Sequence, residues 1–298
     1  MMDFRMDTFI TVCSYMNFTK AASKLNITQP AVSQHIRYLE EAYGCRLFEQ
    51  KGKRISLTKS GELLLSAART MKHDEQQLVR AMRETDREKR YLNFGATLTV
   101  GEYLIPQRVA DYIQKSAPIP ITMLVENTTV LLKFLNEGKI DFAIVEGYFS
   151  KKEYDYHVFQ RESYIPVCAA KHTFQSEPRY IEDLLGENLI VRERESGNRE
   201  ILERYLEGRN LSLEDFANRM EISDIRAIKV LVERDCGIAF LYRASVEREL
   251  REGRMKRIPL REFEIHHDIN FIWRKGSIYG DYYNRLYQEL SGEEKAGR

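Results

Sequence analysis

Residues 27–54 read ITQPAVSQHIRYLEEAYGCRLFEQKGKR, and the first half of this stretch has the pattern of a helix with two different faces. Val32, Ile36 and Leu39 are spaced at i, i+4 and i+7, which predicts the buried side of a helix over about residues 29–42. The opposite side is polar and consists of Gln29, Ser33, Gln34 and Arg37. One amphipathic helix of this kind is usually only solvated on its polar side, so its neighbours decide its role.

Two shorter helices are predicted before this one. The first covers about residues 6–16, where apolar side chains recur at i, i+3, i+4 and i+7, namely Phe9, Val12, Cys13 and Met16. The second is the segment TKAASKL (residues 19–25), which Asn17 or Thr19 can cap. Thr28 is the expected N-cap of the third helix, and Pro30 falls in its first turn, where the missing N–H costs nothing. The pattern predicts a helix-turn-helix unit.

A short basic turn follows the third helix. Gly52 permits a sharp reversal before the β-prone residues 55–57, and the turn carries Lys51, Lys53 and Arg54. A polar helix face fits a major groove, and a basic wing fits the phosphate backbone or the minor groove. We therefore expect a winged helix-turn-helix that binds double-stranded DNA through Thr28, Gln29, Pro30, Ser33, Gln34, Arg37, Lys51, Lys53 and Arg54.

Composition places the chain among ordinary soluble globular proteins of two or three domains, with 298 residues and 43% hydrophobic content. We identify no secretory signal in the N-terminal residues and no run near the roughly 20 apolar residues that cross a bilayer, so we expect a cytoplasmic protein without a membrane partner. The cysteines at 13, 45, 168 and 236 lack C-x-x-C or ligand spacing, which favours packing roles over zinc or disulfides.

The formal charge of +1 is unevenly distributed along the chain. Residues 1–90 hold 16 Lys and Arg against 11 Asp and Glu, whereas residues 91–298 hold 30 against 34. This surplus is consistent with a polyanionic partner for the N-terminal part, although a solvated basic face would show it too.

A long helix is predicted from Thr58 to about Glu88. Leu64, Ala68, Met71, Leu78 and Met82 follow a seven-residue seam, which Glu75 interrupts. Such a helix is too long to bury this seam against the small head alone. We expect it to pair with a second copy of itself, and the alternative is packing against its own C-terminal body.

Strand-like and helical segments alternate after residue 91, which predicts a parallel, doubly wound sheet in two lobes. The expected boundaries are a DNA-binding domain at 1–58, a linker helix at 59–88 and an α/β effector-binding domain at 89–298. Within that domain, lobe I covers about 91–161 and 267–291, and lobe II covers about 162–266.

Ligands of open α/β sheets bind beyond the carboxyl ends of the strands, and two lobes place the site in the cleft between them. The candidates in the corresponding loops are Thr97, Leu98, Thr99, Asn127, Thr128, Glu146, Gly147, Arg192, Ser196, Gly197, Asn198 and Ser223. The hydroxyl residues among them have an alternative role as simple helix caps. Glu146 either disfavours a purely anionic ligand or holds a hydroxyl or amine, and Arg192 is a candidate counter-ion for it.

The run FTKAASKLNITQPAVSQHIRYLEEAYGCRLFEQ (residues 18–50), closed by RISLTKSG (54–61), resembles the N-terminal domain of the LysR-type transcriptional regulators. GATLTVGEYLIP (95–106), RERESGNR (192–199) and GIAFL (237–241) are similar to parts of the effector domain of that family, whose fold is like that of periplasmic binding proteins. One difference is Gln50, where the family usually has an Arg that contacts phosphate.

The resemblance implies a homodimer through the linker helix and commonly a homotetramer. It also implies a small-molecule effector, no further cofactor, and contact with RNA polymerase if the protein is an activator. Two other classes of protein share some of these features. An enzyme is disfavoured because no catalytic motif is present and the six histidines have no acid–base partner by spacing. A simple solute-binding protein is disfavoured by the DNA-reading head.

Overall fold

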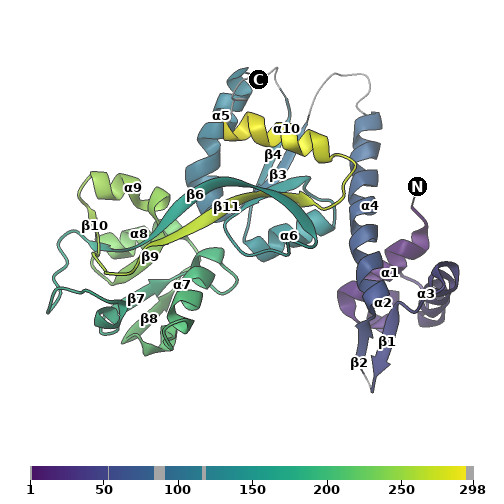
Figure 1. Ribbon diagram of the computed structural model, residues 1–298, viewed down its shortest axis with the longest axis horizontal. Helices are drawn as coiled ribbons and strands as arrows, with labels where there is room; N and C mark the ends of the chain where they lie inside the picture. The colour runs from purple at the N-terminus through teal and green to yellow at the C-terminus, as the bar shows by residue number, and fades with distance from the viewer. Residues whose placement is uncertain (1, 53, 84–90, 116–118, 293–298) are drawn as a thin grey trace. The chain divides into compact units, whose positions relative to one another are not determined.

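The computed structural model describes residues 2–52, 54–83, 91–115 and 119–292 (Figure 1). It divides into two compact units, and each is described by itself. The first unit is Met1–Glu88 together with the short segments Leu135–Lys139 and Arg274–Gly280. The second unit is Lys89–Phe134, Ile140–Trp273 and Asp281–Arg298.

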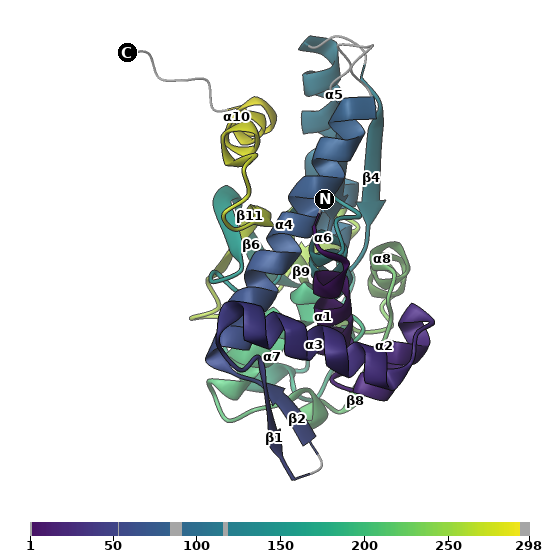
Figure 2. The same cartoon turned by 90° about the vertical axis from the view of Figure 1, so that its right-hand side faces the viewer.

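The head of the first unit is a three-helix group followed by a two-stranded wing (Figure 2). Side-chain caps begin the second and third helices as expected: Asn17 accepts from the amide of Lys20 at 2.9 Å, and Thr28 accepts from that of Ala31 at 3.3 Å. Both helices end in a residue with positive φ, Asn26 and Gly44. The elements are α1 (Phe4–Tyr15), α2 (Phe18–Leu25), α3 (Gln29–Tyr43), β1 (Phe48–Lys51) and β2 (Arg54–Leu57).

The core of the head is formed by the apolar faces that the sequence predicts. Phe9 and Val12 of α1 are fully buried with Val32, Ile36 and Leu39 of α3. Burying side chains of this size contributes about 1.5–3 kcal/mol each, which fixes the side of α3 that remains outside. The helix-turn-helix and the antiparallel wing are therefore confirmed.

The linker helix α4 (Lys59–Arg83) buries different faces in different parts of its length. Thr58 caps it, accepting from the amide of Gly61 at 3.0 Å. Leu64 and Ala68 pack into the core of the head, whereas Met71 and Leu78 remain 55% and 47% exposed. The expected seam is thus split, and the part of the expected helix from residue 84 to 88 lies outside the described residues.

Another face of α4 contacts the C-terminal segments of the same unit. The Arg274 guanidinium, which is fully buried, donates to the Ser66 carbonyl at 3.0 Å and to Asn136 Oδ1 at 2.8 Å. The Asp74 carboxylate accepts from the Ser277 hydroxyl at 2.6 Å and from the Ile278 amide at 3.0 Å. The helix therefore does pack on part of the C-terminal body, but through polar residues that are not in the seam.

The described strands of the second unit lie in one mixed sheet with the order β4-β3-β5-β11-β6-β9-β7-β8, and β10 pairs with β6. The first lobe contributes β3 (Leu92–Ala96), β4 (Ile121–Val125) and β5 (Phe142–Val145). The second contributes β7 (Asn188–Val191), β8 (Asn218–Glu221), β9 (Ile238–Tyr242) and β10 (Met255–Arg257). The long strands β6 (Tyr154–Ala169) and β11 (Ile265–Arg274) run between the lobes (Figure 1).

The predicted parallel pairing holds within each lobe but not at these long strands. β3 pairs parallel with β4 and β5, and β7 pairs parallel with β8 and β9, but β11 pairs antiparallel with β5 and β6 pairs antiparallel with β9. The first half of β6 alternates between buried and exposed residues and lacks the apolar run by which the other strands were recognised. The expected return of the last strand to lobe I is confirmed by the β11–β5 pairing.

The helices of this unit follow the strands closely. Phe142 lies between the rings of Phe94 and Phe271, with centroids 5.0 and 4.5 Å away, and anchors lobe I. The helices are α5 (Ile105–Lys115), α6 (Thr128–Asn136), α7 (Gly197–Glu207), α8 (Ile225–Glu233), α9 (Arg243–Arg251) and α10 (Gly280–Ser291), and the short turns are η1 (Val100–Leu104), η2 (Ile181–Leu184) and η3 (Leu213–Asp215). Because α6 and α7 begin directly after strands of opposite lobes, their N-termini meet at the interlobe cleft.

Candidate functional site

The outer face of α3 presents the polar residues that the sequence selects. Gln29, Pro30, Gln34 and Arg37 are exposed, and Ser33 is partly so. The side-chain amide of Gln29 donates to the Ser33 hydroxyl at 2.8 Å, so these two side chains lie together one turn apart. A face that offers amide, hydroxyl and guanidinium groups matches the donors and acceptors on base edges.

His35 and Tyr38, also on α3, have different environments. His35 Nδ1 lies 3.0 Å from the Thr8 hydroxyl of α1, so this histidine joins two helices. Tyr38 is exposed and its ring lies 3.9 Å from the Arg5 guanidinium carbon. No local pattern predicts this cation–π pair, because α1 and α3 meet only in the fold.

The wing carries part of the expected basic patch. Arg54 is exposed on β2, only the backbone of Lys51 is described, and Lys53 lies outside the described residues. Gly52 has a φ of 64°, which suits the tight reversal. Gln50 Nε2 donates to the Gly52 carbonyl at 3.0 Å, so this departure from the family pattern stabilises the wing turn.

A set of buried polar side chains lies where the loops of the two lobes meet. Its members come from the ends of strands β3, β5 and β7 and the starts of helices α6 and α7, and all are at most 6% exposed. They are Thr97, Thr99, Thr128, Glu146, Arg192, Ser196 and Asn198. We call this set the cleft group, and all seven belong to the residues predicted from the sequence.

Six of the seven residues of the cleft group each have one buried side-chain polar atom without a hydrogen-bond partner. The buried atoms without one are Thr97 Oγ1, Thr99 Oγ1, Thr128 Oγ1, Glu146 Oε2, Arg192 Nη1 and Asn198 Nδ2. Leaving a buried polar group unpaired costs about 1–3 kcal/mol, more for charged groups. Such a concentration in one place indicates a site built to receive polar atoms from a ligand.

Two glycines allow the lobes to come this close together. A Cβ on Gly197 would lie 2.9 Å from the Gly147 Cα, and one on Gly147 would lie 2.4 Å from the Thr128 hydroxyl. Any side chain at either position would push the loops apart. The two predicted glycines therefore set the closest approach of lobe I to lobe II.

Glu146 sits at the centre of this group. Burial raises the pKa of its carboxyl to about 7, and the hydroxyl of Thr99 and the positive charge of Arg192 offset only part of this effect. The Thr99 hydroxyl is near enough to act on the carboxyl, although the two are not aligned as a hydrogen bond.

Two buried tyrosines complete the surroundings of Glu146, and the sequence reasoning missed both. Tyr164 donates to the Asn198 carbonyl at 2.9 Å, and Tyr242 donates to the Glu146 carbonyl at 3.5 Å and contacts His267 Nδ1 at 3.2 Å. Burial and then the charge of Glu146 raise the pKa of both tyrosines well above its usual value. The signal that would have found them is a polar aromatic inside the strands β6 and β9.

The suggested ion pair between Arg192 and Glu146 is not the one observed. Arg192 instead forms a bidentate pair with its neighbour Glu193, Nε to Oε2 at 2.7 Å and Nη2 to Oε1 at 2.9 Å. Adjacent residues at the end of β7 satisfy this geometry without any movement of the lobes. Arg192 thus affects Glu146 through its charge and keeps Nη1 unpaired.

The observed helix caps decide whether the candidate hydroxyl residues serve as caps. Asn127 caps α6, accepting from the Val130 amide at 2.9 Å, and Asp224 caps α8, accepting from the Ala227 amide at 2.9 Å. Thr128 therefore does not cap α6, and Ser196 stands at the N-cap position of α7 without a side-chain cap bond. Ser223 is exposed and Leu98 is half-buried, so neither belongs to the cleft group.

A pocket of about 260 Å³ opens beside the cleft group. It shares Thr128, Ser196 and Gly197 with the loops of the group, and Tyr148 stands at its side. The Arg204 guanidinium carbon lies 3.7 Å from the centre of the Tyr148 ring, which joins α7 of lobe II to the loop after β5 of lobe I. Three carboxylates also line the pocket, those of Glu195, Glu200 and Glu203.

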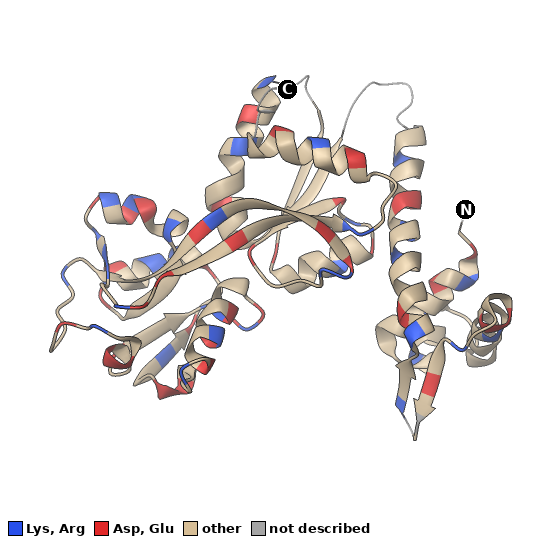
Figure 3. Cartoon of the chain, in the orientation of Figure 1, with Lys and Arg blue, Asp and Glu red and all other residues tan. Residues whose placement is uncertain are grey.

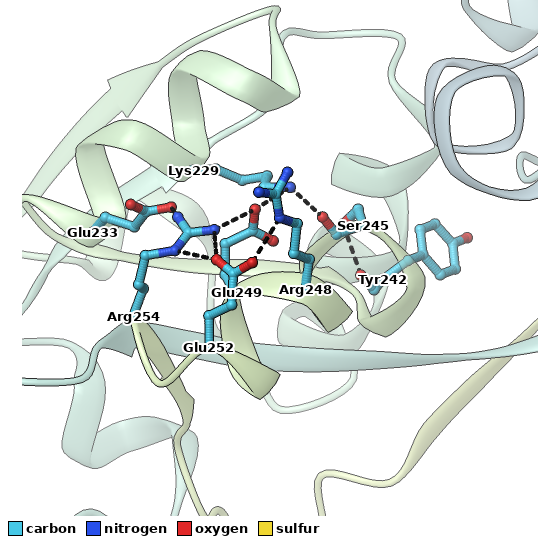
Figure 4. A network of polar contacts seen from close by, with 8 residues as sticks. All are labelled: Lys229, Glu233, Tyr242, Ser245, Arg248, Glu249, Glu252 and Arg254. Carbon is cyan, nitrogen blue, oxygen red and sulfur yellow. Dashed lines mark hydrogen bonds and ion pairs between the residues drawn. The ribbon is translucent and has the colours of Figure 1, made fainter.

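A second polar cluster, on and beside α8 and α9, differs from the cleft group in the pairing of its charges. Its charges are paired internally: Lys229 with Glu249 at 2.8 Å, and Arg254 with Glu233, Glu249 and Glu252 (Figure 4). Figure 3 shows the same mixture of both signs on the helices of this lobe. Because its cations and carboxylates neutralise each other, this cluster stabilises lobe II and is not a candidate site of the same strength.

Within the described ranges no three His, Cys, Asp or Glu side chains are grouped so as to hold a metal ion. No helix in the described part of the chain is long and apolar enough to span a bilayer.

A winged helix-turn-helix with a polar outer face, followed by a long helix and a two-lobed α/β domain with a polar cleft, defines the class of DNA-binding regulators with a ligand-binding domain. The sequence matches "Bacterial regulatory helix-turn-helix protein, lysR family" over residues 5–62 and "LysR substrate binding domain" over residues 85–291. The chain belongs to the LysR family and is a LysR-type transcriptional regulator with an effector-binding domain.

Relatives of this family resemble the chain over most of its length. The HTH-type transcriptional activator CmpR of Synechocystis sp. is 28% identical, covering 91% of this chain and 88% of its own. The HTH-type transcriptional regulator CysL of Bacillus subtilis is 27% identical, covering 90% and 89%. Among solved structures, full-length LysG of Corynebacterium glutamicum has a TM-score of 0.62 at 16% identity, covering 98% and 99%.

Proposed function

We propose that this regulator reads operator DNA with α3 in the major groove and holds the backbone with the wing. The observation that carries the proposal is the exposed row of Gln29, Gln34 and Arg37 on a helix whose other side is locked into the core of the head. Gln29 and Ser33 would read bases, and Arg37 would reach guanine or a phosphate. Thr28 and Pro30 at the helix start, and Lys51, Lys53 and Arg54 in the wing, would contact the backbone.

We further propose that α4 joins two copies of the chain. Met71, Leu78 and Met82 are 55%, 47% and 65% exposed and recur on one face of the helix, a pattern that is costly to leave in water. A second copy of the same helix would cover them as a coiled-coil seam. Two heads related by a two-fold axis would bind a partly palindromic site, and a further pairing of dimers would give a tetramer.

The cleft group is proposed as the effector site, and the unpartnered atoms of Thr97, Thr99, Thr128, Glu146, Arg192 and Asn198 support this role. Gly147 and Gly197 would allow the lobes to close on the ligand. Leu98, Asn127 and Ser223 would support the site from outside the cleft group. LysG was solved with the bound effector Arg, and the CcmR regulatory domain of Synechocystis was solved in complex with 2-PG, which supports a small ligand in such a domain. No catalytic step and no other cofactor are proposed.

The mechanism would be a shift between two arrangements of the oligomer. An effector that binds one arrangement more tightly changes its population, and with it the spacing of the paired heads on DNA. If the regulator is an activator, RNA polymerase would respond to this spacing. The setting would be the cytoplasm, where promoter DNA is found.

Selection of duplexes from a random pool by the full-length chain tests this function. We expect enrichment of a partly palindromic sequence, because two symmetric α3 helices read it. Recovery of unenriched duplexes would contradict the proposal, since it would leave only sequence-independent attraction to phosphate.

A further inference from the structure

The unpartnered atoms of the cleft group differ in hydrogen-bonding type. Arg192 Nη1 and Asn198 Nδ2 can only donate, whereas ionised Glu146 Oε2 can only accept. The hydroxyls of Thr97, Thr99 and Thr128 can do either. A ligand that satisfies the whole group must therefore bring both a strong donor and a strong acceptor.

The charges around Glu146 indicate which hydrogen-bond donor the ligand must bring. Arg192, the cation that acts on Glu146, already neutralises Glu193 through two hydrogen bonds. Within the described chain, no ion pair of Glu146 with a Lys, Arg or His side chain is found. The centre of the cleft thus holds a buried carboxylate without a matched cation, and a ligand ammonium would supply one.

The remaining donors identify the other end of the ligand. Arg192 Nη1 carries positive charge, and Asn198 Nδ2 is an uncharged donor held beside Tyr164, which hydrogen-bonds the Asn198 carbonyl. A carboxylate accepts from two such donors at once. A ligand that carries no acceptor, such as a simple amine, would leave these donors unsatisfied.

We propose that the cleft binds a small zwitterion, with its ammonium on the Glu146 carboxylate and its carboxylate on Arg192 Nη1 and Asn198 Nδ2. This assignment deepens the proposed effector role of the cleft and rests on it. The threonine hydroxyls complete the shell around the ligand. A purely anionic ligand is disfavoured because its charge would oppose that of Glu146.

The dimensions of the cleft limit the ligand to a small one. Gly147 and Gly197 are in near contact, and the adjoining pocket is about 260 Å³. Glu195, Glu200 and Glu203 line that pocket, although Arg204 pairs with Glu200 and Arg199 with Glu203. A side chain that extends from the zwitterion into the pocket would therefore meet Glu195 as the exposed charge.

The assignment predicts a pH dependence of ligand binding. The ionisable groups near Glu146 are Arg192, Glu193, Tyr164 and Tyr242, and the tyrosine pKa values are raised well above 10. Burial raises the pKa of Glu146 to about 7, so this carboxyl ionises between pH 6 and 8. Affinity for an ammonium should rise over this range as the carboxyl ionises, whereas affinity for a plain anion should fall.

Calorimetry on the full-length chain at pH 7.5 tests the assignment. The probes are the twenty common amino acids, the carboxylic acid that lacks the amino group of each binder, and the amine that lacks its carboxylate. We expect at least one amino acid to bind, and removal of either charge to weaken it at least about tenfold, the scale of one charged hydrogen bond.

Two variants form the control pair. Glu146→Gln keeps the shape of the side chain and should lose about tenfold in affinity together with the rise between pH 6 and 8. Glu177→Gln removes an exposed carboxylate that belongs neither to the cleft group nor to the adjoining pocket, and it should retain binding within about twofold, as expected of a screened charge. A far-UV circular dichroism spectrum and a cooperative thermal unfolding transition like those of the wild type show that both variants fold.

Three results would overturn the assignment of a zwitterion to the cleft. It is wrong if no amino acid binds, if the deaminated acids bind as tightly, or if Glu146→Gln binds like the wild type. In those cases, a selected duplex whose binding still responds to another metabolite would leave the effector role intact. Failure of that role would appear separately, as no response of DNA binding to any metabolite.

Discussion

The side-chain amide of Gln29 donates a 2.8 Å hydrogen bond to the hydroxyl of Ser33, one turn further along α3. Both side chains point away from the core that holds the other face of the helix. The bond fixes the orientation of Gln29 before any DNA is present, which lowers the entropy lost on binding. We therefore expect the two residues to act as one reading unit on DNA.

The first prediction concerns this unit. Gln29→Ala and Ser33→Ala should each weaken binding to the selected duplex by about 1–3 kcal/mol and relax base preference at the same positions. The double variant should lose less than the sum, because each single change already breaks the shared bond. Fluorescence anisotropy on the four proteins measures this coupling. Full additivity would show that the two side chains read independently.

Gln50 provides a second prediction. Its amide donates to the Gly52 carbonyl at 3.0 Å and is uncharged, where the family usually has Arg. Gln50→Arg should tighten binding to selected and scrambled duplexes by a similar factor and make the salt slope steeper by about one unit. Gln50→Lys is the matched variant with the same charge. Unchanged affinity in both would mean that this position is beyond reach of the phosphates.

Unlike Gln29, Arg54 should contribute to the affinity for every duplex and not to sequence preference. Removing this exposed cation with Arg54→Ala should weaken all duplexes alike and reduce the salt slope by about one. Arg243→Ala, an exposed arginine of α9, is the control and should leave DNA binding unchanged. A change of sequence preference in Arg54→Ala would contradict the backbone role of the wing.

The seam on α4 gives a fourth prediction. Leu78→Asp places a charge in the proposed interface and should weaken self-association by roughly a hundredfold or more, because a buried unpaired charge costs several kcal/mol. Val230→Asp adds the same charge to a side chain of α8 that is 57% exposed and serves as control. Sedimentation equilibrium measures both. A stable dimer of Leu78→Asp would place the interface elsewhere.

The pKa of Glu146 leads to a prediction on stability. Since the pKa is raised from 4.5 to about 7 on folding, the bound proton stabilises the fold below pH 4.5, and this contribution is lost as the pH rises to about 7. Without ligand, Glu146→Gln should be more stable than wild type at pH 8 by up to about 3 kcal/mol, with no difference near pH 4. Thermal unfolding at both pH values measures it. Equal stability at pH 8 would mean that Glu146 is already compensated.

The sequence predicted those features that depend on local pattern. The caps Asn17, Thr28 and Thr58 and the two faces of α3 follow from side-chain chemistry within one or two turns, and the structure confirms them. The loops of the cleft were found because ligand sites collect at the carboxyl ends of strands.

What the sequence missed depends on contacts between distant segments. The pairing of Arg192 with Glu193, the approach of Tyr164 and Tyr242 to Glu146, and the antiparallel strands β6 and β11 have no local signature. The seam on α4 was misread in part, because Leu64 and Ala68 belong to the core of the head. A heptad pattern cannot show which of its positions an adjoining domain covers.

The most direct test of the whole account is the ratio of affinities for selected and scrambled duplexes across a range of KCl concentrations. Both affinities should fall on similar salt slopes while the ratio stays above roughly a thousand for the wild type, as base readout requires. The ratio should drop at least about tenfold in Gln29→Ala. A ratio near one at every salt concentration would contradict sequence-specific regulation by this chain.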